Sequence, residues 1–243
     1  MATLYHPVLT YDPITDPTGR RTNHYQVERS RDGFVFEALA DPLTGTATPF
    51  YRGDSLIIAT AGSYRHEMFV YPGPRASYAV FLGPSNPLND SGTALVAPPG
   101  AFLSLQRGAL AGAVAALRTV VRMLEKGLVP CGGAVGRVIV KTDSEYVALG
   151  CTERIGGWVR RGWLGCGESR IRDWDLWEVV LALLDVIMHQ WGVEILFWLV
   201  PAEWNRDAKY LAAEGLKIPP PFVVDCRPRS QELREDRRVG VRC

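Results

Sequence analysis

The order of apolar segments after Asp54 constrains the fold more than any other feature of this chain. "SLIIATAG", residues 55–62, is a buried strand that ends in a turn, and two strands joined by "PGPR" follow as a hairpin. A long helix, the strand 137–142, two further helical segments, another buried strand and a last helix complete the series. This order predicts an α/β fold with a mixed five-stranded sheet and helices on both faces.

The long helix is defined by a repeat of apolar residues. They recur every three or four positions and mark one face of a helix, at Leu110, Val114, Leu117, Val121 and Leu124. Gly127 follows in the place where helices commonly end. The segment is therefore predicted to lie on the sheet with one face buried.

Three regions are expected along the chain. Residues 1–53 are rich in turn-forming residues and predict a partly ordered N-terminal extension. Residues 54–216 hold the folded domain. Residues 217–243 form a Pro-containing, Arg-rich C-terminal tail, with seven basic residues against four acidic ones. Pro in "IPPP" cannot continue a helix, so the domain is expected to end before it.

Composition excludes several classes of protein. The 243 residues carry a net charge of +1, whereas a dedicated nucleic-acid binder usually has a clearly basic domain. No apolar run reaches the roughly 18–20 residues of a membrane span, and the N-terminus shows no secretory signal. Five cysteines lack metal-ligand spacing, so a zinc site is not expected. An intracellular protein is predicted, with nucleus or cytoplasm left open.

Local motifs resemble the ribonuclease H family, cellular type 1 and fungal-like, over residues 54–216. The longest is "TDSEYVALGCTERIGGWVRRGWLGCGESRIRDWDLWE", residues 142–178, which has an acid and Ser at a strand end and "DLW" at the start of a helix. "SLQRGAL", residues 104–110, and "VPAEWNRDAKYLA", residues 200–212, resemble two further family segments. The resemblance implies a ribonuclease H-like fold.

The resemblance also marks four positions at which the family carries carboxylates that hold two divalent cations. In this chain they are Ala61, Ala109, Asp143 and Lys209. One carboxylate beside an ammonium group is a poor ligand set for Mg²⁺, so no cofactor and no intact catalytic site are expected. Asp143 would bind metal only if the other acids were restored. We predict instead that the Lys209 ammonium reaches the Asp143 carboxylate. The alternative role for Asp143 is that of a helix N-cap.

Several residues are candidates for contact with nucleic acid. Gln106 matches a family position that reads the 2′-hydroxyl of RNA, and a basic protrusion of the family lies near Arg160. Asp173 departs from the pattern, because the family has Asn there in a phosphate pocket. Ordinary solvation or packing is the alternative interpretation for each candidate. The candidates are Gln106, Arg107, Ser144, Tyr146, Arg160 and Arg161.

Three functions follow as hypotheses. The first is a catalytically inactive ribonuclease H-like protein that binds a protein partner or a second copy of itself. The second is a non-cleaving binder of an RNA/DNA hybrid or of double-stranded RNA. The third is a hybrid-specific ribonuclease whose acids were mutated to Ala by design at Ala61 and Ala109.

Overall fold

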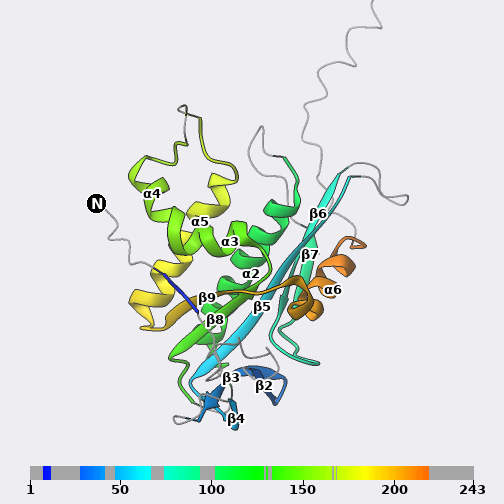
Figure 1. The fold of residues 1–243 in the computed structure, drawn as a ribbon, viewed down its shortest axis with the longest axis vertical. Coiled ribbons are helices and arrows are strands. Elements are labelled where there is room, and N and C mark those ends of the chain that lie inside the picture. Colours follow the sequence, from blue (N-terminus) through cyan, green and yellow to red (C-terminus); the bar gives the residue numbers. More distant parts are fainter. Residues whose placement is uncertain are drawn as a thin grey trace, which may run out of the picture.

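The computed structural model of the chain is shown in Figure 1. The structure describes residues 8–11, 28–41, 47–66, 74–93, 102–128, 130, 133–165, 167 and 169–218. The C-terminal tail beyond Ile218 and most of residues 1–27 therefore lie outside the described residues, and so does the basic part of the tail. The predicted three-region division of the chain stays a prediction.

Five strands form the centre of the sheet, in the spatial order β7-β6-β5-β8-β9. They are β5 (Ser55–Arg65), β6 (Arg75–Phe81), β7 (Asp90–Thr93), β8 (Arg137–Thr142) and β9 (Glu194–Leu199). β5, β6 and β7 are antiparallel neighbours, whereas β8 runs parallel to both β5 and β9. The predicted mixed sheet is confirmed.

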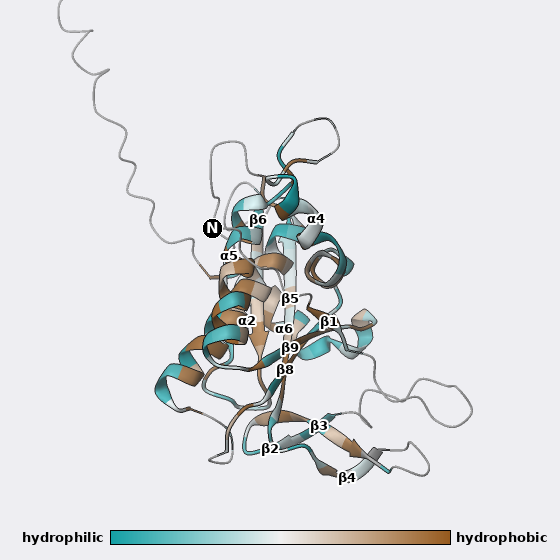
Figure 2. Ribbon diagram, turned by 90° about the vertical axis from the view of Figure 1, so that its left-hand side faces the viewer, coloured by the Kyte–Doolittle hydropathy of each residue, from teal (hydrophilic) through white to brown (hydrophobic). Residues whose placement is uncertain are grey.

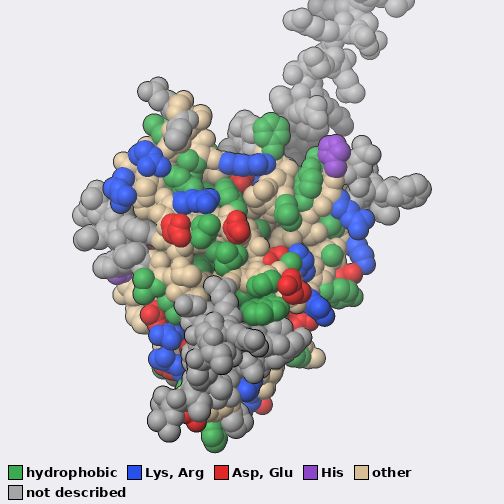
Figure 3. All heavy atoms as spheres, in the orientation of Figure 1, with side chains coloured by type: hydrophobic (Ala, Val, Ile, Leu, Met, Phe, Trp, Pro, Cys, Tyr) green, Lys and Arg blue, Asp and Glu red, His purple; other side chains and the backbone are tan. Residues whose placement is uncertain are grey.

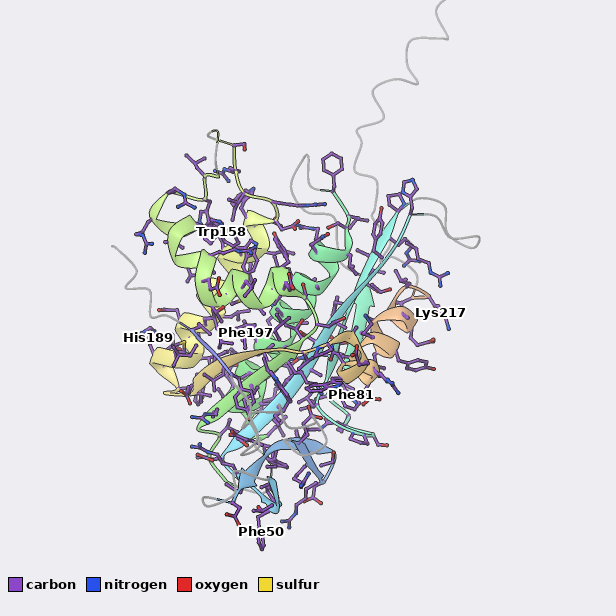
Figure 4. All side chains as sticks on the ribbon, in the orientation of Figure 1. Phe50, Phe81, Trp158, His189, Phe197 and Lys217 are labelled. Atoms are coloured by element: carbon purple, nitrogen blue, oxygen red, sulfur yellow. The ribbon has the colours of Figure 1, made fainter. Side chains whose placement is uncertain are left out.

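The predicted count of five strands is wrong, because the N-terminal extension adds four more to the described sheet. β1 (Leu9–Thr10) pairs with β9, while β2 (Glu28–Arg31), β3 (Phe34–Ala40) and β4 (Ala47–Tyr51) pair with one another and reach β5 through β3. Phe50, labelled in Figure 4, lies at the lower tip that these strands form. β1, β2 and β4 span only two to five residues, and β3 does not alternate strictly between apolar and polar residues, so their pairing was not visible in the sequence.

The extension covers part of one face of the central sheet. Tyr11 and Val35 pack in a buried cluster with Ile57, Ile139 and Trp198. On the same face, Glu28 of β2 forms a buried ion pair with Lys141 of β8. The described strands of the extension are therefore packed on the sheet of the domain.

Helices lie on both faces of the sheet, as predicted. α2 (Leu105–Lys126) and α5 (Trp174–Asp185) share the main buried core with one face of the sheet, and α6 (Arg206–Gly215) packs against β5 and β6 on the other. α3 (Glu145–Leu149) and α4 (Ile155–Arg160) lie between β8 and α5 along the chain. Three short helical turns complete the described elements: η2 (Gly150–Arg154), η3 (Val186–Gln190) and η4 (Ala202–Trp204). Not one of the described helices is both long and apolar enough to cross a bilayer.

The limits of α2 follow from its end residues. The Ser104 hydroxyl accepts a hydrogen bond from the Arg107 amide at 3.1 Å, which caps the first turn. Gly127 adopts φ 63°, and its amide bonds back to the last turn. Figure 2 shows hydrophobic and hydrophilic bands alternating along this helix, as expected for one buried face.

Candidate functional site

A groove of about 410 Å³ opens where β5, β8, α2 and α6 meet. Asp143 comes directly after β8, which pairs with β5 up to Thr60 and Thr142. The carboxyl end of β8 therefore lies beside Thr60 in the middle of β5, which continues to Arg65. The groove is lined by Gly62, Leu105, Gln106, Ala109, Asp143, Ser144, Glu145, Tyr146, Arg154 and Lys209.

Small residues bring α2 down onto β5 beside the groove. A Cβ atom on Gly62 would lie 2.2 Å from the Ala109 nitrogen, and one on Gly108 would lie 2.6 Å from the Ser77 carbonyl oxygen. Real Cβ atoms do not approach other atoms so closely, so both positions require glycine. This contact places Ala109 at the groove.

The Asp143 carboxylate is bonded at both oxygens. The Lys209 ammonium donates to its Oδ2 at 2.9 Å, and the Asn205 side-chain amide donates to its Oδ1 at 2.9 Å. The predicted ion pair is therefore confirmed. Asn205 also donates to the Thr60 carbonyl at 2.9 Å, so this buried side chain ties β5, the end of β8 and α6 together.

Asn205 was not predicted as a site residue. Its place in the sequence, just before α6, is typical of a helix cap, but its side chain makes no capping bond. The alternative prediction, that Asp143 caps the following helix, is wrong. Ser144 caps α3 instead, because its hydroxyl accepts from the Val147 amide at 3.4 Å. Asp143 is thereby left facing Lys209.

The groove does not fit a pair of divalent cations. Within the described part of the chain, no three His, Cys, Asp or Glu side chains are grouped so that they could hold a metal ion. Asp143 has an ammonium group at 2.9 Å where a metal site needs further carboxylates. Ala109 offers only a methyl group. No chemical step through a bound metal follows from these residues.

Of the four positions at which the resembled family carries carboxylates, Ala61 alone is absent from the described lining of the groove. It is 1% exposed and belongs to a cluster of small side chains between the sheet and α6. Ala59, Ala79, Ala208 and Ala212 are the other buried members. An aspartate at position 61 would enter closely packed alanines unless α6 moved.

The prediction that Arg107 contacts nucleic acid is wrong, because the structure buries this side chain. Its guanidinium bonds to Asp173 Oδ1 at 2.9 Å and to both oxygens of Asp175, at 3.1 and 2.7 Å. Burial lowers the pKa of Arg107, but the bonds to Asp175 and Asp173 outweigh it and raise that pKa overall. Arg107 therefore joins α2 to the start of α5.

The Tyr146 hydroxyl is also engaged inside the protein, although its ring lines the groove. It accepts a hydrogen bond from the Trp177 indole at 3.0 Å and donates to the Arg172 carbonyl at 3.0 Å. Burial raises the pKa of Tyr146 above its ordinary value, so the hydroxyl stays protonated at neutral pH. Only the ring edge is left for a ligand in the groove.

The remaining candidates are solvent-accessible. Gln106 is exposed at the first turn of α2, and Ser144 is half-buried at the opposite side of the groove. Arg160 and Arg161 are exposed at the end of α4 and are not among the groove's lining residues. Figure 3 shows several Lys or Arg side chains over α4 and its neighbouring loop. Arg154, which was not a candidate, lies in the groove itself.

Comparison with known proteins points to one family. No family model matches the chain. The ribonuclease H of Syntrophotalea carbinolica is 37% identical over 82 residues, which are 34% of this chain and 46% of the relative. The ribonuclease HI of Xylella fastidiosa is 36% identical over 75 residues, 31% of this chain and 47% of the relative. The chain thus spans less than half the length of these relatives.

The solved structures that resemble this chain have lower sequence identity than these relatives. The solution structure of the PFV RNase H domain has a TM-score of 0.45 and 18% sequence identity, and the match covers 66% of this chain and 93% of that domain. The strand order described above and the similarity to curated ribonucleases H agree with each other. The chain therefore has a ribonuclease H-like fold and is similar in sequence to ribonucleases H over about a third of its length.

Proposed function

We propose that this chain is a non-cleaving ribonuclease H-like protein that serves as a protein-interaction or scaffolding module. The ion pair between Lys209 and Asp143, at 2.9 Å, carries the proposal. In the family that the sequence resembles, both positions hold carboxylates. Here a cation stands where negative charge would be needed to attract metal ions.

Electrostatics makes metal binding at this place unfavourable. Lys209 is about half exposed, so its interactions are screened by water. Even so, Mg²⁺ about 4 Å from an ammonium group meets a repulsion of about 2 kcal/mol in bulk water, and more in a protein environment. Asp143 alone cannot offset both this repulsion and the partial dehydration of the ion.

The packing around Ala61 favours a natural alanine over one introduced by design. Its buried neighbours on β5, β6 and α6 are themselves alanines, which fill the space at the back of the groove. Exchange of a native aspartate for alanine would leave a void where the carboxylate had been, whereas Ala61 is packed against these alanines. The loss of acids is thus matched by the surrounding side chains.

A cleavage assay tests the non-cleaving part of the proposal. A labelled RNA/DNA hybrid is incubated with the full chain in Mg²⁺ or Mn²⁺, beside an active ribonuclease H. We expect no cleavage by this chain. The variant Asp143→Asn is the matched control, because cleavage that disappears in this variant comes from the groove and contradicts the proposal.

The interaction role is tested separately. The near-neutral charge of the chain supports a protein partner over tight, unspecific binding of nucleic acid. Light scattering after size exclusion would show whether a second copy is the partner. A dimer that persists at low concentration supports self-association, and a monomer leaves a different protein as the partner.

A second candidate function is non-cleaving binding of an RNA/DNA hybrid or of double-stranded RNA. It is favoured by five exposed arginines at the end of η2, the end of α4 and the loop before α5: Arg154, Arg160, Arg161, Arg170 and Arg172. Fluorescence anisotropy of a labelled hybrid at two salt concentrations tests it. Micromolar or tighter binding that weakens with salt supports this function, and absence of binding favours the protein-interaction role.

A further inference from the structure

A second groove, of about 700 Å³, lies between β6, β7, α2 and α5, away from the degenerate site. Figure 2 shows α2 and α5 side by side on the face turned to the viewer. Apolar side chains of the two helices line this groove, among them Val114, Val121, Leu176 and Leu183. A concave apolar surface of this size is typical of sites that receive a ligand.

Two cations lie along the groove. Arg118 and Arg122 are both exposed and stand four residues apart on α2, so they are neighbours on the helix surface. No ion pair among the described residues involves either of them, and Arg122 donates only to the Thr119 hydroxyl at 3.1 Å. Like charges at this spacing repel each other. An acidic ligand would remove that repulsion.

The opposite wall offers one carboxylate against these two cations. Asp90 is the one carboxylate that lines the groove, and it accepts a hydrogen bond from the Tyr78 hydroxyl at 3.3 Å. Burial raises the pKa of Tyr78, and so does the neighbouring Asp90 carboxylate, whereas the positive charges of Arg118 and Arg122 lower it by less. One carboxylate therefore stands against two cations along the described lining of this groove.

We infer that this groove binds an acidic amphipathic helix of a partner protein. The apolar residues of the partner helix would pack against Val114 and Leu183. Two carboxylates of that helix, one turn apart, would pair with Arg118 and Arg122. This inference rests on the proposed function as a protein-interaction module and names the site and the chemistry of the partner. The complementary charges set the orientation of the helix more than its affinity.

Two segments of this chain that lie outside the described residues have charges that fit this groove less well than an acidic helix does. Residues 94–101, "ALVAPPGA", contain no charged residue and so cannot neutralise the arginines. Residues 219–243 carry six basic and four acidic residues, a net positive charge that Arg118 and Arg122 would repel. An acidic segment from another protein is the complementary ligand.

The test uses the full chain and a pair of synthetic probes. One is a fluorescein-labelled helical peptide of about 16 residues, roughly 24 Å long, with Leu at i, i+3, i+4 and i+7 and two Glu four residues apart. The matched peptide carries Lys in place of both Glu. Fluorescence anisotropy is measured for the natural chain, for R118E/R122E, and for R160E/R161E, which reverses another exposed Arg pair as a control.

We expect the Glu peptide to bind the natural chain and R160E/R161E alike, and to bind R118E/R122E at least about tenfold more weakly. The Lys peptide should show the reverse preference and bind R118E/R122E best. A second variant, Ala115→Trp, fills the groove and should weaken the Glu peptide while the melting temperature confirms that the chain is folded.

Three results with the full chain would overturn the inference. They are no binding of the Glu peptide, equal binding of both peptides, and equal loss in R160E/R161E. Binding that emerges only after removal of residues 219–243 would also overturn it, because the tail would then be the occupant. None of these results bears on hybrid cleavage, so failure here and failure of the non-cleaving proposal are distinguishable.

Discussion

Replacing Arg107 with alanine is expected to destabilise the protein strongly. The side chains of Arg107 and Asp173 are 1% and 2% exposed, so the Arg107→Ala variant leaves the Asp173 carboxylate buried with only the exposed Arg172 guanidinium, 4.0 Å away, as a cation. Breaking a buried ion pair in this way costs about 3–5 kcal/mol. That is a large share of the roughly 5–15 kcal/mol by which a folded protein is stable.

The assay is urea unfolding followed by tryptophan fluorescence, with a thermal melt beside it. For a domain of this size the loss corresponds to a fall in melting temperature of roughly 6–20 °C. Arg118→Ala is the matched control, because Arg118 is exposed on the same helix. It should change the free energy of unfolding by no more than about 0.5 kcal/mol.

A double variant separates loss of charge pairing from loss of packing. Arg107→Met with Asp173→Asn keeps most of the buried volume and leaves no buried charge at 173, and asparagine tolerates the positive φ of 55° found there. It should be clearly more stable than Arg107→Ala. An Arg107→Ala variant as stable as the natural chain, with weakened hybrid binding, would refute this reasoning and return Arg107 to the surface role first predicted from the sequence.

Three further predictions follow from burial and pairing. Lys209→Ala should change the free energy of unfolding by less than about 1 kcal/mol, and less at high salt, because its pair with Asp143 is partly exposed; urea unfolding at two salt concentrations checks this. Burial raises the pKa of the Cys151 thiol, so mass spectrometry should find it unalkylated by iodoacetamide at pH 8 unless denaturant is present, and labelling in the folded chain would contradict its place in the core. Removal of residues 1–53 should expose Ile57 and Trp198 and promote aggregation, as light scattering would show, whereas a stable monomer would show that the extension is dispensable.

The central sheet and the long helix were predictable because their periodicity is strong. The buried strand 137–142 and the apolar stripe through Leu110 and Leu117 each indicate one structure. Strands β1, β2 and β4 were missed because they are short, and the extension joins the central sheet through residues far away in the sequence. No local pattern shows, for example, that Glu28 meets Lys141 across the sheet.

The candidate site was predictable where motifs mark neighbouring ends of strands and helices. The approach of Lys209 to Asp143 follows from the resemblance, since both positions are expected at one place. The role of Arg107 was not predictable, because one turn of α2 holds both an exposed Gln106 and a buried arginine. Only the packing of α5, with its two aspartates, decides between them.

The claim on which this account depends is that the groove cannot hold two metal ions. Crystals of the protein soaked in Mn²⁺ and examined by anomalous diffraction test it most directly. The account predicts no manganese peak beside Asp143 and an intact bond from Lys209. Two peaks about 4 Å apart next to Asp143, with the Lys209 side chain displaced, would contradict it.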